Sequence, residues 1–373
     1  MLDLLDENPY QLLRQLRESD PVCWVPELNA WLVTRYDLAV EVLKNSGSFT
    51  VDDPRFTTAR VTGPSMLSLD GPAHARQRNA FTRGLRPEAL GRDFIQAEIS
   101  RLLEGIRPLG QAELRRDLAG PLAAAVMGDL LGLNQPAAAI LGWYNEIVSV
   151  VANMAGSTET GVCHTPSFGM LAENIALAAG EGNSALLTAA AKTLGADELV
   201  SNAAVLLFGG IETTEGMISN AILHTLTYGT LAVEESLRLE PAAAMVDRYA
   251  TRDVTLGSTQ VRQGDQVTVS ITGANRDPAA FADPDLYDPS RANAGKHLAF
   301  AHGPHFCIGA HLARVETELA VAAVIKLPGL RLSGHAVPRG VVFRKPPELY
   351  ATWEVSQLMR DASPPSVSPK AAR

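Results

Sequence analysis

A single cysteine in a glycine-rich loop is the residue of this chain best suited to bind a metal. Cys307 lies within residues 300–310 (FAHGPHFCIGA), and a helical pattern of apolar residues begins directly after it. Glycines let the backbone approach the sulfur, and the positive end of a helix stabilises a thiolate. Cys23 and Cys163 lie far away and form no C-x-x-C pair, so we expect neither a disulfide framework nor a zinc ribbon. The alternative for Cys307 is a buried structural thiol.

An acid and an alcohol interrupt a long apolar helix pattern at residues 206–215 (LLFGGIETTE). Thr213 follows Gly209 by four residues, so its hydroxyl can bond the Gly209 carbonyl, bend the helix and open a groove for a small molecule such as oxygen. The alternatives are a solvated carboxylate for Glu212 and a purely helix-bending role for Thr213.

These two segments resemble motifs of the cytochrome P-450 superfamily, and the likeness extends from about residue 8 to residue 356. The cysteine-ligand pattern F-x-x-G-x-H/R-x-C-x-G is met by Phe300, Gly303, His305, Cys307 and Gly309. The oxygen-helix pattern [A/G]-G-x-[D/E]-T is met by Gly209, Gly210, Glu212 and Thr213. One departure is Ala301, at a position where the family often has glycine.

The resemblance implies a cofactor and a proton-delivery pair. Cys307 would be the axial ligand of heme b (iron protoporphyrin IX), a thiolate that pushes electron density toward bound oxygen. Thr213 would organise water at the oxygen site, and Glu212 would relay protons inward. Four further residues would lie beside the cofactor: Phe300, Gly309, Gly209 and Gly210.

Heme carries two carboxylates that need cationic or hydrogen-bonding partners. His74 and Arg78 match the H-x-x-x-R helix of the family, and Arg248 and His305 match its remaining carboxylate contacts. Each of these residues alone would more often be a surface charge.

A structural ion network is also implied. Glu235 and Arg238 lie three residues apart on one helix face, as in the E-x-x-R signature of the family, and Arg291 follows downstream. The resemblance makes these three residues a buried triad with a role in folding.

The substrate pocket is the part about which the sequence says least. By resemblance, Val205, Phe208, Ala243 and Met245 line it, and we expect a medium-sized, largely apolar substrate. Two regions are shorter than the family usually has: residues 214–234, where a turn at 226–230 stands in place of a helix pair, and residues 152–194.

The surrounding elements predict a helix-rich body. Helical spacing occurs near residues 36–46, 94–106, 119–131, 137–152, 184–193 and 197–227, and again after Cys307 up to Pro328. Alternating segments near residues 22–34 and 252–273 predict small sheets. We therefore expect a mainly α fold with small β-sheets, the cytochrome P-450 fold, with heme buried between the oxygen-binding helix and the cysteine-ligand loop. Residues 1–360 should form one domain and residues 361–373 a flexible tail.

Composition narrows the class of protein. An apolar share of 46% with 20% charged residues is that of a globular protein, and a net charge of -9 argues against binding to nucleic acid or anionic membranes. The first residues have neither the basic start nor the apolar run of a signal peptide, so we expect a cytoplasmic monomer.

These observations predict a heme-dependent monooxygenase that uses O2 to hydroxylate or otherwise oxidise its substrate in secondary metabolism. Electrons should come from an external ferredoxin and ferredoxin reductase, because no clustered cysteines indicate a fused iron–sulfur domain. Candidates for a basic docking patch are Arg76, Arg83, Arg86 and Arg314, for which a solvated face is the alternative. A peroxide-using heme-thiolate enzyme and a non-catalytic heme-binding sensor or scaffold remain open, although the Glu212–Thr213 pair disfavours both.

Overall fold

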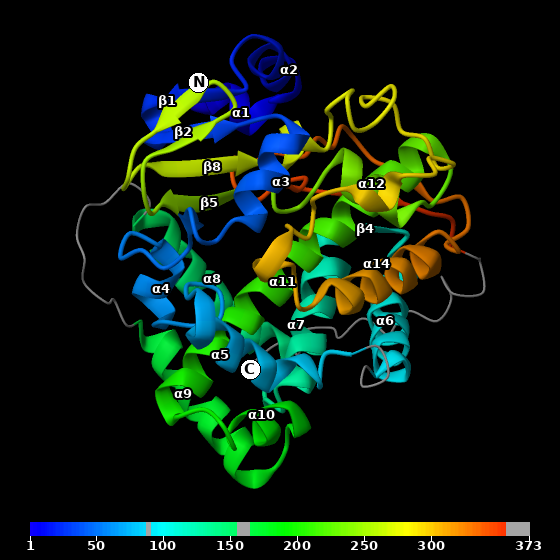
Figure 1. The fold of residues 1–373 in the computed structure, drawn as a ribbon. Coiled ribbons are helices and arrows are strands. Elements are labelled where there is room, and N and C mark those ends of the chain that lie inside the picture. Colours follow the sequence, from blue (N-terminus) through cyan, green and yellow to red (C-terminus); the bar gives the residue numbers. More distant parts are fainter. Residues whose placement is uncertain (87–90, 155–164, 356–373) are drawn as a thin grey trace, which may run out of the picture.

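Helices form most of the molecule, and the largest sheet lies at one end of it (Figure 1). The computed structural model describes residues 1–86, 91–154 and 165–355. The α-helices are α1 (Leu2–Glu7), α2 (Tyr10–Ser19), α3 (Tyr36–Lys44), α4 (Thr57–Thr62), α5 (Gly71–Thr82), α6 (Arg92–Ile106), α7 (Gly120–Leu130), α8 (Ala137–Met154), α9 (Pro166–Glu181), α10 (Ala185–Ala190), α11 (Ala196–Tyr228), α12 (Val233–Leu239), α13 (Ile271–Ala274) and α14 (Ala310–Val324). None of the helices described is long and apolar enough to cross a membrane.

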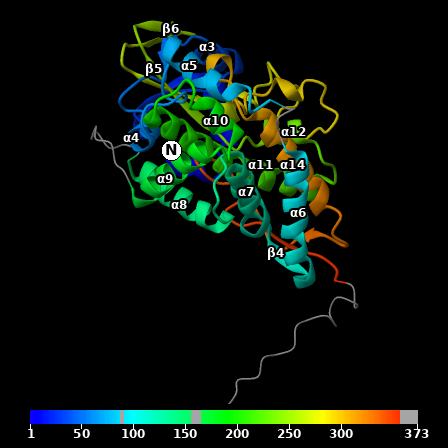
Figure 2. The same cartoon turned by 90° about the horizontal axis from the view of Figure 1, so that it is seen from below.

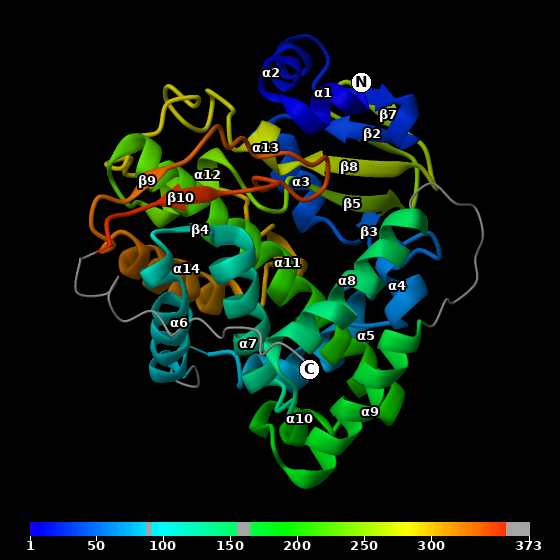
Figure 3. The ribbon, with the colours of Figure 1, turned by 180° about the vertical axis from the view of Figure 1, so that it is seen from behind.

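The largest sheet joins strands from residues 22–50 to strands from residues 245–270. The strands are β1 (Val22–Val25), β2 (Ala30–Val33), β3 (Phe49–Thr50), β4 (Gln111–Glu113), β5 (Met245–Ala250), β6 (Val254–Leu256), β7 (Thr259–Val261), β8 (Gln266–Ser270), β9 (Arg331–Leu332) and β10 (Tyr350–Thr352). Five of them pair in the order β1-β2-β8-β5-β3, with β2 and β8 parallel. Seen from behind, this sheet lies beside α1 and α2, far from α9 and α10 (Figure 3). Smaller sheets pair β4, β10 and β9, and β6 with β7.

Helix α11 forms the centre of the molecule. It is 33 residues long, and buried residues occur all round it, as expected for a helix enclosed by others. Helices α7 and α14 pack against it, and the view from below shows α6 beside them (Figure 2). Gly229 ends α11 with a φ of 78°, a left-handed conformation that favours glycine. Only four residues separate α11 from α12, so the described chain has no helix pair at 226–230, in agreement with the short spacing in the sequence.

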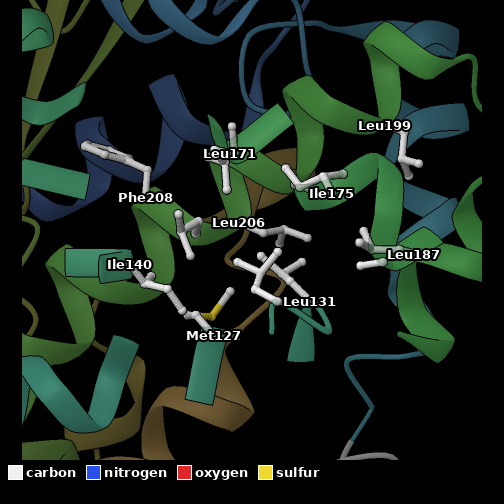
Figure 4. Close-up of a cluster of buried hydrophobic side chains, with 14 of the residues drawn as sticks. Met127, Leu131, Ile140, Leu171, Ile175, Leu187, Leu199, Leu206 and Phe208 are labelled. Carbon is white, nitrogen blue, oxygen red and sulfur yellow. The ribbon is translucent and has the colours of Figure 1, made fainter. Parts of the chain in front are cut away.

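One hydrophobic cluster joins α7, α8, α9, α10 and α11 (Figure 4). Its members include Met127, Leu131, Ile140, Leu171, Ile175, Leu187, Leu199, Leu206 and Phe208. Helix α9 was not among the helices expected from the sequence. Phe168, Leu171 and Ile175 do have helical spacing, but Gly169 and Gly180 weaken the pattern.

Gly210 is required by the contact between α11 and α7. A Cβ at Gly210 would lie 2.3 Å from the Met127 sulfur, whereas a Cβ at Gly209 would meet nothing within 4 Å. We expect Gly210→Ala to lower the free energy of unfolding by about 1–3 kcal/mol through overpacking. The matched change Gly209→Ala should raise it by about 0.5–1 kcal/mol, because alanine favours the helix. Urea titrations of both variants test this, and equal effects would contradict the packing argument.

Candidate active site

The loop before α14 holds Cys307 in place with backbone contacts. The Cys307 N–H donates to the Phe300 carbonyl at 2.9 Å, and Ala310 begins α14 three residues later. The side chain of Cys307 is accessible, although protein atoms surround the sulfur on most sides. Burial raises the pKa of the thiol, while the Gly309 N–H and the positive charge of Arg78 act in the opposite direction. Both groups stabilise a thiolate, so the loop has the chemistry of a metal-ligating sulfur.

Ala301 departs from the family pattern at a strained position of this loop. Its φ is 56°, in the left-handed region that costs a residue with a Cβ about 1–2 kcal/mol. We expect Ala301→Gly to stabilise the protein by about 0.5–1 kcal/mol, since glycine removes this strain but adds about 0.4–1 kcal/mol of backbone entropy to the unfolded chain. Ala299→Gly, where φ is not left-handed, is the control and should be destabilising. Thermal unfolding of the two variants checks the opposite signs.

Thr213 bonds the helix backbone as its spacing predicts. Its hydroxyl donates to the Gly209 carbonyl at 2.6 Å, on a side of α11 where a Cβ at Gly209 would meet open space. Gly210, by contrast, lies against Met127 and serves helix packing. The structure therefore brings Gly209 and Thr213 to one face and places Gly210 on another.

Glu212 is buried and paired with a lysine that the sequence did not indicate. Its Oε1 lies 2.9 Å from the Nζ of Lys345, and the same Nζ lies 2.5 Å from Oε2 of Glu215. The other oxygen of Glu215 accepts from Arg115 at 3.0 Å. Glu212 is therefore no solvated surface carboxylate. Lys345 lies far from Glu212 in the sequence and in no motif, so no local pattern pointed to it.

A group of cationic and donor side chains gathers around Asp70. His305 Nε2 lies 2.9 Å from Oδ1 of Asp70, and the rings of His305 and His74 are 4.3 Å apart. Burial alone would raise the pKa of Asp70, but hydrogen bonds from His305, Thr50 and the Val51 N–H lower it to about 2. Asp70 is a site residue that the sequence analysis did not identify.

Three residues expected to bind the heme carboxylates, His74, Arg248 and Arg78, have donors that are not used in hydrogen bonds within the described residues. Burial, with the charges of His305 and Arg78, lowers the pKa of His74 to about 4, and its Nε2 is buried without a partner. Burial lowers the pKa of Arg248 to about 10; in the described part of the chain Arg248 forms no ion pair and donates to the Asp247 carbonyl at 2.7 Å. Arg78 donates to the carbonyl of Phe306 at 2.6 Å, next to Cys307. Together these residues offer an anion two or more partners.

Glu235, Arg238 and Arg291 form one buried network. Arg238 makes two hydrogen bonds of 2.7 Å to the Glu235 carboxylate, and Arg291 Nε lies 3.1 Å from both carboxylate oxygens. The Arg238 side chain is 0% exposed and also donates to the carbonyls of Asn275, Pro284 and Leu286. The triad thus ties α12 to the segment that precedes the Cys307 loop.

Aromatic side chains pack together beside the N-terminal half of α11. Phe208 lies 5.8 Å from the ring of Phe343 and 6.3 Å from that of Tyr144, and Phe343 pairs with Ala243 through its backbone. Val205 is buried one turn before Phe208. Met245, in contrast, packs with Leu5, Leu13, Cys23, Val25 and Leu32 beneath the sheet. The structure does not bring Met245 to the other expected pocket residues.

The expected basic patch is partly neutralised. Arg76 pairs with Glu198, and Arg314 Nε lies 2.5 Å from Glu234. Arg83 and Arg86 are exposed. No group of three or more His, Cys, Asp or Glu side chains in the described ranges could hold a metal ion, and Cys163 lies outside those ranges.

Comparison with known proteins identifies the family. A family model described as Cytochrome P450 matches residues 218–327. The chain is 34% identical over 360 residues to "Cytochrome P450 monooxygenase PikC" of Streptomyces venezuelae, over 87% of this chain and 85% of that protein. It is 32% identical over 361 residues to "Nocardicin C N-oxygenase" of Nocardia uniformis subsp. tsuyamanensis, over 87% and 90% of the two chains. The structure of P450BioI in complex with hexadec-9Z-enoic acid ligated acyl carrier protein matches with a TM-score of 0.83 at 27% identity, over 94% of this chain and 100% of that chain.

The chain therefore belongs to the cytochrome P450 family, and it is a cytochrome P450 monooxygenase. The mainly helical fold with small sheets expected from the sequence is confirmed. The cofactor of this family is a heme held by a cysteine thiolate. The residues present fit that group. An accessible sulfur lies beside Arg78, and within the described residues the Nε2 of His74 has no partner and the buried guanidinium of Arg248 forms no ion pair, so both suit the heme carboxylates.

Proposed function

We propose that this protein binds heme b through Cys307 and uses O2 to hydroxylate or otherwise oxidise a medium-sized, largely apolar small molecule. The observation that carries the proposal is the Cys307 loop, in which one sulfur meets the Gly309 N–H and the positive charge of Arg78 at the start of α14. His74, Arg78, Arg248 and His305 would bind the heme carboxylates, with Asp70 orienting His305.

The residues of this chain have separate tasks in that reaction. Bound heme supplies the iron at which O2 is activated. Cys307 would hold the iron as a thiolate, and the Gly309 N–H would keep negative charge on the sulfur. The Thr213 hydroxyl, anchored on the Gly209 carbonyl, orders water in the open space beside α11. Glu212 takes a proton from solvent at its carboxylate and passes it inward.

The wall of Phe208, Tyr144 and Phe343 supports an apolar substrate. Aromatic faces bury large apolar area and exclude water from the reacting centre. Ala243, whose backbone pairs with that of Phe343, carries only a methyl side chain. Secondary metabolism remains our assignment of the biological role, and the name of the nocardicin C N-oxygenase relative is compatible with it.

Electrons would come from a separate ferredoxin and ferredoxin reductase. The exposed Arg83 and Arg86 lie at and beyond the end of α5, the helix that carries His74 and Arg78, and suit an acidic partner. We place the protein in the cytoplasm as a monomer.

The experiment combines a surrogate ferredoxin and reductase, NADPH and ¹⁸O₂ with a panel of apolar compounds that shift the heme spectrum on binding. We expect substrate-dependent NADPH consumption and one ¹⁸O atom in the product. Spectral binding without substrate-dependent consumption or labelled product would favour the sensor or scaffold alternative instead.

A further inference from the structure

One lysine, Lys345, pairs with two carboxylates of α11, those of Glu212 and Glu215. The Lys345 ammonium lies 2.9 Å from Glu212 Oε1 and 2.5 Å from Glu215 Oε2. The three side chains are 17%, 10% and 9% exposed, respectively. An ammonium in so dry a place attracts each carboxylate much more strongly than it would in water.

The backbone of Lys345 is fixed, so only its side chain can move. Its N–H donates to the Arg339 carbonyl at 3.2 Å, and the Arg339 N–H donates back at 3.0 Å. The preceding residue, Arg344, is fully buried, and its Nε donates to Glu240 at 2.9 Å. The Lys345 side chain therefore starts from a fixed backbone position, from which its ammonium reaches the carboxylates of α11.

The two pairings of Lys345 are unequal. The contact with Glu215 has hydrogen-bond geometry, whereas the contact with Glu212 is an ion pair only. Glu215 also accepts from Arg115, whose Nε is anchored on the Pro347 carbonyl at 3.0 Å. If Glu212 leaves, Lys345 and Arg115 both keep Glu215, and no cation is left without a partner.

Glu212, in contrast, has no other cation within ion-pair distance in the described chain. Nor does a hydrogen bond join its carboxylate to the Thr213 hydroxyl, which is committed to Gly209. A buried carboxylate that leaves its only cation is costly as an anion. Glu212 should therefore leave Lys345 after it takes up a proton, and it should return once that proton is gone.

We propose that Lys345 is a positioning residue that holds ionised Glu212 at its outer position and, by staying with Glu215, releases Glu212 when it is protonated. One proton moves from solvent water to the Glu212 carboxylate, travels with the side chain toward Thr213 and leaves there to ordered water. The carboxylate then returns to Lys345. This inference rests on the proposed role of Glu212 and Thr213.

The test compares Lys345→Gln, Lys345→Arg, Glu215→Gln and Glu212→Gln with wild type, with the exposed Lys326→Gln as control. Crystal structures of the heme-loaded proteins give the Glu212 conformation, and product formed per NADPH and the solvent deuterium isotope effect give proton delivery. Lys345→Gln should leave Glu212 in several conformations and lower product per NADPH about tenfold, because an acid contributes about 10²–10⁴-fold and is here retained. Lys345→Arg should restore most of the loss.

Glu215→Gln keeps Lys345 and tests the release directly. Lys345 should then bind Glu212 with hydrogen-bond geometry, so the isotope effect should rise. A single unchanged Glu212 conformation and unchanged product per NADPH in Lys345→Gln, with a large loss in Glu212→Gln, would overturn the role of Lys345 alone. No loss in Glu212→Gln would overturn the role of Glu212 and this inference with it.

Discussion

Replacement of Glu235 by alanine is expected to lower the free energy of unfolding by about 3–5 kcal/mol, because it leaves buried guanidinium groups without their carboxylate. Arg238 is 0% exposed and Arg291 is 6% exposed, and both bind the two oxygens of Glu235. The carbonyl acceptors around Arg238 cannot replace a negative charge. Chemical denaturation of the heme-loaded protein measures the effect, and the purified variant should also contain less heme.

Glu98→Ala is the matched control for this change. Glu98 and Arg101 form an ion pair at the same i, i+3 spacing on α6, but the Arg101 side chain is 63% exposed. An exposed pair of this kind contributes about 0.2–0.5 kcal/mol. If Glu235→Ala and Glu98→Ala lowered the free energy of unfolding by similar amounts, burial would not be the reason that the triad stabilises the protein.

Loss of the Thr213 hydroxyl is expected to lower product per NADPH about tenfold or more while the heme content stays the same. A positioned proton-transfer group contributes about 10²–10⁴-fold, and alternative water can replace part of it. The reducing equivalents should appear as hydrogen peroxide instead of product. Product and peroxide are measured together for Thr213→Ala and Thr213→Ser, and serine should retain most of the coupling.

Thr225→Ala separates this effect from helix bending. Thr225 lies on the same helix and donates to the Ala221 carbonyl at 2.7 Å, the same i−4 bond that Thr213 makes to Gly209. Both alanine variants should lose about 1 kcal/mol of stability. Only Thr213→Ala should lose coupling, and equal behaviour would assign Thr213 a structural role.

Features with a local cause could be predicted from the sequence. The bond from Thr213 to Gly209 follows from their spacing on one helix, and the place of Cys307 before α14 follows from the pattern after it. The Glu235–Arg238 pair has the same kind of origin. The left-handed φ of Ala301 is one that glycine adopts readily, and glycine is the residue that the resemblance led us to expect there.

Features that depend on chain segments meeting in space could not be predicted. Lys345 reaches Glu212 because residues 339–345 fold back beside α11, and Asp70 becomes a site residue only when His305 lies next to it. Gly210 was expected beside the cofactor by resemblance, together with Gly209, but one residue along a helix changes direction by about 100° and turns Gly210 toward Met127. Strand β5 (Met245–Ala250) lies wholly before the expected β segment at 252–273, and the sequence did not indicate it because Asp247 and Arg248 interrupt the apolar alternation. The expected flexible tail at 361–373 lies outside the described residues.

The most direct test of the central claim is the absorbance spectrum of the dithionite-reduced, carbon monoxide-bound protein, recorded for wild type and for Cys307→Ser at equal heme content. Thiolate ligation predicts a strongly red-shifted Soret band in the wild type that is absent from the serine variant. An ordinary heme band in the wild type, or the same red-shifted band in both proteins, would contradict the assignment of Cys307 as the heme ligand.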